Sequence, residues 1–459
     1  MSGHASTQMT DERIAIVGGG FSGLTHAYYL RRKFPHLKIT IFEASEWGGE
    51  MQTREHEGCL LERGPDSFLE RTGLFTQLVS DLGLTNELLA ESKSTSKRYI
   101  LKEGLLLKAP MKPFQLLTTA LLFFPEKIKI FLAFRKKFSV WPTISFFDLA
   151  RNVMGFSAAE YLASPFARGV YGAEAEDLEF AALFPELFKK IASAPKLGQA
   201  LKEFSIERRE YWNRELNGIE FKKGIYSFKG GLRTLLQSLI KNLKENGVEM
   251  QSVKIVRIRP EGRGYSLSSK NQTIGTFEKI ILATSAMESA NLVREFDKEL
   301  ATRLSELTYS PVNVLYAAWD KKNFFHNGYG FLVPRKEKLS IMGTIFASNI
   351  FSGRSDENTF LTKTMISGDN VLFKDEELAN LSFESHQRIF KSLTAPRWTK
   401  VYRHTPGIPR YAKGYGEWKR DVLSMAAQHK NLNFAGWCFS GVGMSDNLEA
   451  AYQFAKTTT

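Results

Sequence analysis

The chain has 459 residues, of which 43% are hydrophobic and 24% charged, an ordinary balance for a globular protein of two or three domains that excludes wholesale disorder. Its net charge of +13 would suit nucleic acid, anionic lipid or an acidic substrate. No zinc-finger spacing, RNA-binding signature or basic tail occurs, so we expect no nucleic-acid partner. The two cysteines, Cys59 and Cys438, are too few for a disulfide framework and favour a cytoplasmic location.

Neither a membrane span nor a metal site is expected. No apolar run reaches the roughly 18 residues that a spanning helix needs, and the polar N-terminal segment MSGHASTQMTDER has no apolar signal core. The 8 histidines are scattered without the spacing of metal ligands.

A glycine-rich turn near the N-terminus joins a predicted strand over Arg13–Val17 to a predicted helix over Leu24–Lys33, and a second strand is predicted over Lys38–Phe42. In such a βαβ unit the first glycine permits the tight turn, the second lets the backbone approach a pyrophosphate, and the third lets helix pack on strand. The N–H groups and positive dipole end of the helix favour phosphate. The predicted pyrophosphate site consists of Gly18, Gly19, Gly20, Phe21, Ser22 and Gly23.

Glu43 follows the second strand, 20 residues after Gly23. An acid at this position can hydrogen-bond the ribose hydroxyls, which favours FAD or NAD over NADP. A bare GxGxxG motif is weak evidence, but here the strand, turn, helix, strand and acid all occur in the required order. The sequence therefore predicts a dinucleotide site.

The rest of the chain alternates helix-rich and strand-rich blocks. Residues 92–205 have a mainly helical pattern, a turn, helix and strand follow over Ser227–Ile258, and strand-like pieces dominate residues 300–405. We predict an α/β fold in which a discontinuous Rossmann-like domain is interrupted by a helical insertion and a mixed-sheet substrate domain. The predicted bounds are 11–90, 206–295 and 406–459 for the three parts of the Rossmann-like domain, 91–205 for the insertion and 296–405 for the substrate domain.

The segment Phe114–Phe138 mixes phenylalanine, leucine and isoleucine with lysine and arginine, and Pro125 interrupts it. Such a pattern is typical of a helix that lies in a membrane interface, with its cations towards the lipid phosphates. A helical lid over a substrate cavity would have the same pattern. The sequence leaves both interpretations open.

Motifs that occur in order along almost the whole chain point to a family. They are Gly48-Gly49, Gln52-Thr53, Gly64 to Ser67, Lys97 to Tyr99, Pro165 to Phe188, Tyr226 to Leu232, Gly328 to Pro334, Ala435-Gly436 and Gly441 to Met444. Together they resemble the motifs of the flavin-containing amine oxidases, and within this superfamily they are most similar to those of the oxygen-dependent protoporphyrinogen and coproporphyrinogen oxidases. The resemblance implies FAD as a non-covalent cofactor, and it implies that residues 114–138 match a membrane-facing insertion.

The resemblance also implies individual flavin contacts. Glu43 would hold the ribose, and Val256 would meet the adenine through its backbone. Cys438 lies where some amine oxidases bond their flavin covalently, but its local motif differs, so we expect no bond. The other implied contacts are Glu50, Met51, Gly64, Pro65, Asp66, Ser67, Trp437, Val442, Gly443 and Met444.

One position departs from the family pattern. Relatives usually carry an arginine just before the paired glycines, whereas this chain has Trp47 in a loop one residue shorter. The expected arginine contact near the pyrophosphate is therefore in doubt. Arg54 is a candidate to replace it.

The implied substrate is a porphyrinogen, whose oxidation removes six electrons in three two-electron steps to the flavin, each followed by reoxidation with oxygen and release of hydrogen peroxide. This scheme needs no strong protein base, and no residue is assigned as catalytic acid or base. Arg98 matches an arginine that grips a substrate propionate, although a surface arginine is the alternative. Phe331 and Leu332 would line the macrocycle slot, and because they alternate on a strand we expect only one to face it.

Other readings stay open at this stage. An amine oxidase or a carotenoid-type desaturase would use the same fold, and a flavin-carrying scaffold without turnover belongs to a different class of protein. One arginine does not decide between protoporphyrinogen and coproporphyrinogen. Expected partners are the porphyrinogen and molecular oxygen, with a homodimer and the inner face of the cell membrane as options that the sequence leaves open.

Overall fold

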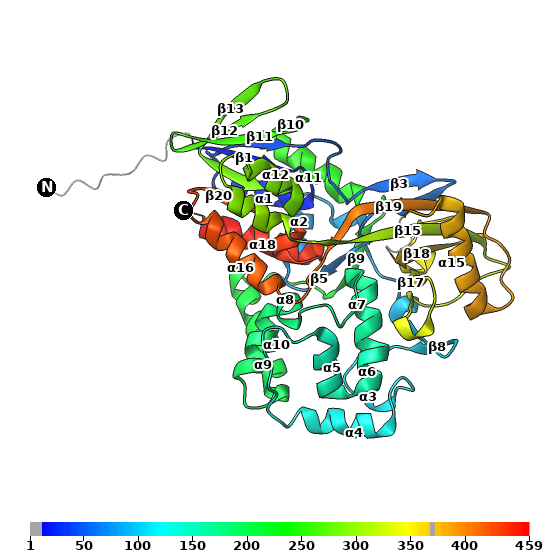
Figure 1. Cartoon of the computed structure of the whole chain (residues 1–459). Coiled ribbons are helices and arrows are strands. Elements are labelled where there is room, and N and C mark those ends of the chain that lie inside the picture. The colour runs from blue at the N-terminus through cyan, green and yellow to red at the C-terminus, as the bar shows by residue number, and fades with distance from the viewer. Residues whose placement is uncertain (1–11, 368–371, 459) are drawn as a thin grey trace.

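The computed structural model describes residues 12–367 and 372–458. Figure 1 shows three regions: a parallel sheet, a long mixed sheet beside it, and a helical region that projects away from the parallel sheet. No helix within the described ranges combines the length and apolar character that crossing a membrane requires.

The parallel sheet has the strand order β10-β2-β1-β14-β20, with all neighbouring strands parallel. Helices α1, α11 and α18 pack together against it in one apolar core. The predicted discontinuous Rossmann-like arrangement is confirmed, because the strands of this sheet come from three separate parts of the chain. The bounds are β1 Arg13–Val17, β2 Lys38–Phe42, β10 Glu249–Gln251, β14 Lys279–Leu282, β20 Leu432–Phe434, α1 Phe21–Lys33, α11 Arg233–Glu245 and α18 Met444–Thr457.

Short elements flank this sheet. An antiparallel meander follows β10, two helices follow β14, and hairpin strands with one short helix lie between β2 and the mixed sheet. The bounds are β11 Arg257–Glu261, β12 Gly264–Ser268, β13 Thr273–Phe277, α12 Ala286–Val293, α13 Lys298–Ser305, β3 Thr53–His56, β4 Cys59–Glu62, β5 Phe68–Glu70, α2 Leu74–Asp81, β6 Leu88–Ala90, β9 Gly224–Phe228, α16 Tyr415–Ala426 and α17 Trp437–Ser440.

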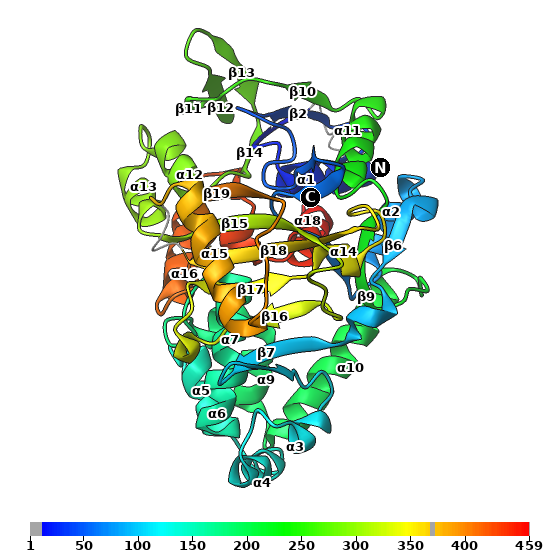
Figure 2. The ribbon, with the colours of Figure 1, turned by 90° about the vertical axis from the view of Figure 1, so that its right-hand side faces the viewer.

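The mixed sheet has the order β19-β15-β18-β17-β16-β7-β8. Helix α15 covers one face, onto which Figure 2 looks, and the opposite face is turned towards the parallel sheet and the helical region. The strands β7 and β8 come from a segment with a mainly helical sequence pattern, and β7 joins the sheet by parallel pairing with β16. The bounds are β7 Arg98–Lys102, β8 Leu105–Lys108, β15 Tyr309–Asp320, β16 Gly330–Leu332, β17 Ile341–Ile345, α14 Ala347–Ile350, β18 Thr359–Ser367, α15 Asp375–Phe390 and β19 Trp398–Pro409.

The helical region begins after β8. Ser145 caps α5 by accepting a hydrogen bond from the Asp148 N–H, and Gly155 ends that helix with a positive φ of 107°. Helices α3 and α4, from the segment with two open interpretations, form the tip farthest from the parallel sheet (Figure 1). The bounds are α3 Gln115–Thr118, α4 Phe124–Ala133, α5 Phe146–Met154, α6 Phe156–Ala158, a π-helical turn Ala159–Ala163, α7 Ser164–Tyr171, α8 Phe180–Leu183, α9 Pro185–Ser193 and α10 Leu197–Glu215.

Candidate functional site

The three motif glycines of the N-terminal turn, Gly18, Gly20 and Gly23, have different surroundings. At Gly18 the backbone has a φ of 112°, and an added Cβ would lie 2.4 Å from the Ala283 carbonyl oxygen. At Gly23 an added Cβ would lie 2.0 Å from the Gly18 carbonyl oxygen, so only glycine lets α1 pack onto the turn. At Gly20 the nearest atom would be 4.0 Å away, which leaves open space in front of the helix N-terminus. This geometry suits a pyrophosphate.

The side chains of Phe21 and Ser22 point away from that open space. Phe21 is buried and stacks on Phe75 with ring centroids 6.1 Å apart. The Ser22 hydroxyl donates to Asn447 Oδ1 at 2.5 Å, which joins the first turn of α1 to the first turn of α18. The glycine turn and the C-terminal glycine loop, 425 residues apart in sequence, are thereby brought together.

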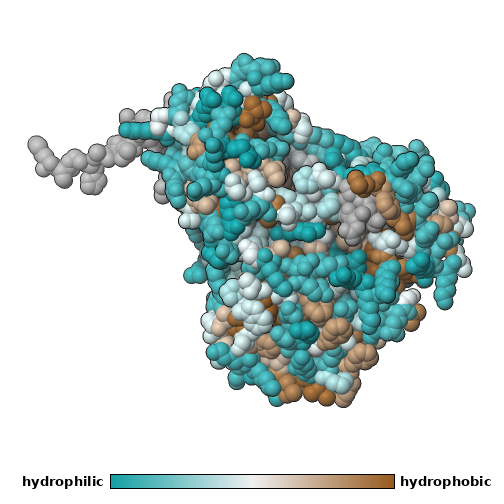
Figure 3. Space-filling view, viewed as in Figure 1, coloured by the Kyte–Doolittle hydropathy of each residue, from teal (hydrophilic) through white to brown (hydrophobic). Residues whose placement is uncertain are grey.

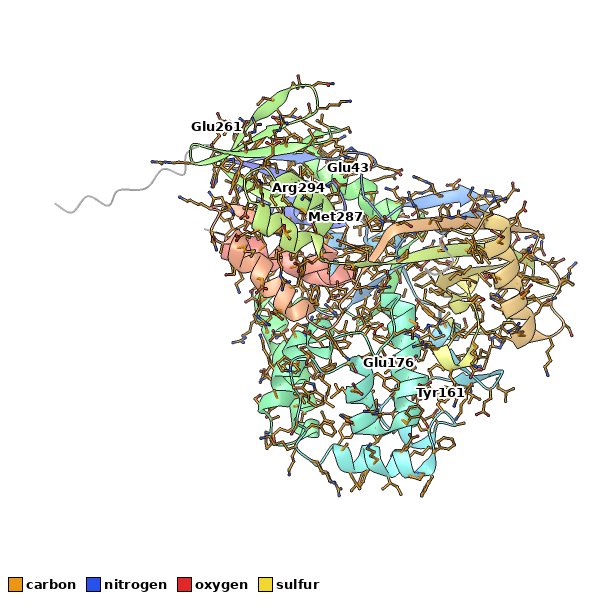
Figure 4. All side chains as sticks on the ribbon, viewed as in Figure 1. Glu43, Tyr161, Glu176, Glu261, Met287 and Arg294 are labelled. Atoms are coloured by element: carbon orange, nitrogen blue, oxygen red, sulfur yellow. The ribbon has the colours of Figure 1, made fainter. Side chains whose placement is uncertain are left out.

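Glu43 is buried beside the turn, in the region of the parallel sheet shown in Figure 4. One carboxylate oxygen accepts from the Gly19 N–H at 2.7 Å, and the other accepts from the Ser45 N–H at 2.7 Å. These bonds hold the carboxylate at the end of β2, where the βαβ pattern predicts a ribose contact.

Trp47 lies against the turn. An added Cβ at Gly19 would be 2.5 Å from its ring, and its indole N–H donates to the Ser252 hydroxyl at 3.1 Å. Arg54, the candidate to replace the missing arginine, pairs instead with Glu46 at 2.5 Å. In this chain an indole therefore covers the side of the glycine turn.

The segment after the paired glycines folds over the parallel sheet. Glu50 pairs with His404 at 2.7 Å. Burial alone would raise the pKa of Glu50, but the hydrogen bond and charge of His404 together with the charge of Arg63 outweigh it, and the pKa is lowered. The Met51 side chain is in the core. At Gly64 an added Cβ would lie 2.3 Å from the Glu50 carbonyl oxygen, so the two parts of the segment touch.

Lys363 on β18 fixes the next part of this segment. Its side chain is 3% exposed, and its ammonium donates to the Gly64 carbonyl oxygen at 2.7 Å and to both Asp66 carboxylate oxygens at 2.9 and 3.0 Å. Pro65 and Ser67, on either side of Asp66, are half-buried. Sequence reasoning missed Lys363, although a lone lysine in the strand TFLTKTMIS was a signal.

The C-terminal glycine loop lies between α17 and α18. Val442 and Trp437 are half-buried, and Met444 is buried at the start of α18. The Gly443 N–H donates to Asp446 Oδ2 at 3.1 Å, and the Asn447 amide donates to the Gly441 and Gly443 carbonyls, both at 2.9 Å. The loop is thus held rigidly.

Two further residues bear on the predicted flavin site: Cys438, where no covalent bond is expected, and Val256, which is expected to meet the adenine. Burial raises the pKa of the Cys438 thiol to about 11, which disfavours the reactive thiolate. The backbone N–H of Val256 donates to the Ser268 carbonyl oxygen at 3.0 Å and is therefore already used within the meander.

An apolar cavity of about 660 Å³ lies between the mixed sheet and helices α5 and α7. Leu332 faces it, and an added Cβ at Gly169 of α7 would be 2.4 Å from the Leu332 Cδ2. Phe331 also borders the cavity, but its ring is 2% exposed and packs against Phe346, His386 and Phe390 on the other face of the sheet. The alternation expected for this pair is what the structure shows.

Arg98 at the start of β7 lines the same cavity. Its guanidinium pairs with Glu91 at 3.3 Å and lies 4.5 Å above the ring of Tyr329. Tyr329 is in turn hydrogen-bonded to Ser67, and burial raises the pKa of its phenol to about 12. Through Tyr329 the cavity meets the Gly64 to Ser67 segment.

Known proteins share this architecture. The crystal structure of a protein from Exiguobacterium sp. 255-15, provisionally named a protoporphyrinogen oxidase, superposes with a TM-score of 0.79 at 22% identity and covers 98% of this chain and 99% of that one. The structure of a putrescine oxidase superposes with a TM-score of 0.68 at 14% identity, covering 97% of this chain and 98% of that one. These likenesses establish the fold.

Curated relatives extend over nearly the whole chain. Coproporphyrinogen III oxidase of Staphylococcus aureus is 25% identical, covering 94% of this chain and 96% of the relative. The mitochondrial protoporphyrinogen oxidase of Nicotiana tabacum is 26% identical, covering 96% and 93%. The family model of the flavin containing amine oxidoreductases matches residues 21–456. The chain therefore belongs to the flavin containing amine oxidoreductase family and is an oxidoreductase with FAD as its cofactor.

Proposed function

We propose that the protein oxidises a porphyrinogen to the porphyrin, with FAD as the hydride acceptor and molecular oxygen as the final oxidant, and that it releases hydrogen peroxide. The apolar cavity carries this proposal, because a flexible, largely hydrophobic macrocycle with carboxylates suits an apolar space of about 660 Å³ with an arginine in its wall. The curated relatives named above support the same substrate class.

The position of the cavity supports a reaction at the flavin. Met365 lines the cavity, and Lys363, two residues earlier on β18, holds the Gly64 to Asp66 segment that the family resemblance assigns to the flavin. Residues two apart on a strand lie on the same face of the sheet. A substrate in the cavity would therefore lie next to that segment.

The proposal gives the chain's residues two tasks. FAD, when bound, accepts two electrons at a time as a hydride equivalent. Arg98 would hold a propionate with its planar guanidinium while Leu332 packs against the macrocycle. We propose that the flavin is bound without a covalent bond and that its contacts are the glycine turn Gly18–Gly23, Glu43, Glu50, Met51, Gly64, Pro65, Asp66, Ser67, Val256, Trp437, Val442, Gly443 and Met444.

An amine oxidase or a carotenoid-type desaturase is the competing activity within this fold. A cationic amine would be expected to meet a carboxylate, but the described residues that line the cavity include none. A carotenoid needs no arginine. Arg98 therefore favours a carboxylate-bearing substrate.

The test is aerobic incubation of the purified holoprotein with protoporphyrinogen IX and with coproporphyrinogen III, followed by porphyrin fluorescence and by a peroxide assay. Anaerobic mixing should bleach the bound flavin, which a scaffold without turnover would not allow. The proposal would be wrong if neither porphyrinogen bleached the flavin of the fully FAD-loaded protein.

We also propose that the tip formed by α3 and α4 contacts a membrane surface from the cytoplasmic side. Phe114, Phe123, Phe124 and Phe131 are between 50% and 73% exposed there. The lower tip in Figure 3 is accordingly hydrophobic, and Arg135 lies over the Phe131 ring at 4.4 Å. Apolar side chains with adjacent cations suit an interface with anionic lipid.

Co-sedimentation with vesicles of phosphatidylcholine and phosphatidylglycerol tests this contact. The double variant Phe124→Ser/Phe131→Ser should lose about tenfold or more in vesicle affinity, because two exposed aromatic rings no longer insert. Met287→Ser, at an exposed apolar site on α12 in the parallel-sheet region, is the matched control (Figure 4). Equal binding by both variants would favour the lid interpretation.

A further inference from the structure

The apolar cavity can distinguish porphyrinogens by their number of carboxylates. Protoporphyrinogen IX carries two propionates on neighbouring pyrroles, and the other two pyrroles carry vinyl groups. Coproporphyrinogen III carries a propionate on every pyrrole. The inference below rests on the proposed function and concerns which of these substrates the site accepts.

The walls of the cavity are almost entirely apolar. Ile100, Leu332 and Met365 line it from the mixed sheet, and Ala150, Phe166 and Val170 line it from α5 and α7. Among the described lining residues, Arg98 is the one charged side chain.

The positive charge of Arg98 is already balanced in part, because Glu91 lies 3.3 Å from the guanidinium. Lys102 follows Arg98 on the same face of β7, but its ammonium donates to the carbonyl oxygens of Ala120 and Leu121, both at 3.2 Å. The walls therefore offer one place where a carboxylate can be paired.

A second cavity, of about 440 Å³, borders the C-terminal end of α7 and contains Arg168, Arg410 and Lys413. It also contains Glu174 and Asp177. Arg168 lies 3.5 Å from Glu174 and donates to the Val333 carbonyl oxygen at 3.0 Å. The basic side chains of this second cavity therefore share it with acidic ones.

We infer that the apolar cavity selects porphyrinogens whose carboxylates lie along one edge, such as protoporphyrinogen IX, against the tetracarboxylate coproporphyrinogen III. With two propionates, one edge meets Arg98 and water at the cavity mouth while the vinyl-bearing edge enters the apolar part. With a propionate on every pyrrole, either orientation places carboxylates against apolar walls. A carboxylate removed from water without a partner is strongly disfavoured.

The experiment compares three substrates on the wild-type holoprotein: protoporphyrinogen IX, mesoporphyrinogen IX and coproporphyrinogen III. Mesoporphyrinogen keeps two propionates and replaces vinyl by ethyl, so it controls for the chemistry of the vinyl groups. We expect kcat/KM for the first two to agree within about tenfold, and that for coproporphyrinogen to be about 100-fold lower. Equal or faster turnover of coproporphyrinogen overturns the inference.

A pair of variants tests whether the lack of a second cation in the cavity causes the selectivity. Val170 on α7 is 38% exposed, so a longer side chain there has room to reach into the open cavity. Val170→Lys should raise the ratio of coproporphyrinogen to protoporphyrinogen kcat/KM about tenfold over Val170→Met, because it supplies a second cation. Equal ratios in the two variants at equal flavin content overturn the charge argument.

The same assay separates the inference from the function on which it rests. Rapid flavin bleaching by coproporphyrinogen at least as fast as by protoporphyrinogen would overturn the selectivity and leave porphyrinogen oxidation standing. Failure of all three porphyrinogens to bleach the flavin would overturn the proposed function, and the selectivity with it.

Discussion

The edge of the parallel sheet and the apolar cavity are lined by different kinds of chemical group. At the sheet edge the contacts are backbone groups, glycines without room for a Cβ, and buried polar side chains such as Glu43 and Asn447. In the cavity the walls are apolar and Arg98 supplies the charge. The first region suits a cofactor of fixed shape, and the second suits a flexible hydrophobic substrate. Variants in the first region should therefore affect FAD retention, and variants in the second should affect KM.

The largest expected effect breaks this separation, because Lys363 holds the Gly64 to Asp66 segment and lies two residues before the cavity-lining Met365 on β18. Lys363→Met should cost about 3 kcal/mol of stability, since the Asp66 carboxylate and the Gly64 carbonyl lose their donor. It should also release FAD faster and raise KM. Urea unfolding and FAD fluorescence would measure the effect. Lys363→Met/Asp66→Asn should recover part of the stability; an unaltered single variant would contradict the assigned contact.

A pair of glycine variants sharpens the comparison within the cofactor region. Gly23→Ala should destabilise the fold by about 2 to 3 kcal/mol, because its Cβ would overlap the Gly18 carbonyl oxygen. Gly20→Ala should leave the stability of the apoprotein near that of the wild type and weaken FAD binding about tenfold or more, because its methyl enters open space. Titration of apoprotein with FAD separates them. Unchanged FAD affinity in Gly20→Ala would remove the turn from the pyrophosphate site.

The buried carboxyl group of Glu62, at the end of β4, leads us to predict that the free energy of unfolding depends on pH. Burial raises its pKa to about 7, although hydrogen bonds from the Leu232 N–H and the Thr53 hydroxyl oppose the shift. The folded protein therefore keeps a proton that the unfolded chain releases above its ordinary value of 4.5. The contribution of Glu62 to the free energy of unfolding is therefore fully present below pH 4.5 and is lost as pH rises towards about 7.

Glu62→Gln should remove this loss, which is at most about 3 kcal/mol. Urea midpoints on both sides of the pH window would show it, with Glu57→Gln in the exposed turn after β3 as the control. If the wild-type midpoint did not fall across the window, Glu62 would not carry the buried proton.

The smallest expected effect lies in the cavity. Arg98→Ala should raise KM for the porphyrinogen about tenfold, the value of one charge-assisted contact, with flavin content unchanged. Arg98→Lys should recover only part of the loss, because an ammonium cannot grip a carboxylate with a planar fork. An unchanged KM in Arg98→Ala would place Arg98 outside the substrate site.

Features encoded in a short stretch of sequence could be predicted. The discontinuous Rossmann-like fold, with the glycine turn between β1 and α1, is confirmed, and so are the family and its FAD cofactor. These features depend on local spacing, as at Gly23, which must be glycine because the Gly18 carbonyl oxygen lies beside it. The alternation of Phe331 and Leu332 also followed from strand geometry alone.

Features that join distant segments could not be predicted. The packing of Arg98 over Tyr329, the Lys363 contact with Asp66 and the Ser22 bond to Asn447 each depend on how separate elements dock. Strand β7 lies in a stretch with helical composition but pairs with β16, more than 200 residues away, and β8 pairs with β7. Tertiary pairing overrode local propensity there.

The hydrogen bond between Ser22 and Asn447 has a consequence for biosynthesis. Helix α1 leaves the ribosome early, whereas α18, which carries the other half of this contact, is among the last elements to emerge. The nascent chain must therefore hold an unfinished nucleotide cleft through most of its translation. Flavin loading would follow the docking of α18 on α1, and the yellow colour of the purified protein would report that docking.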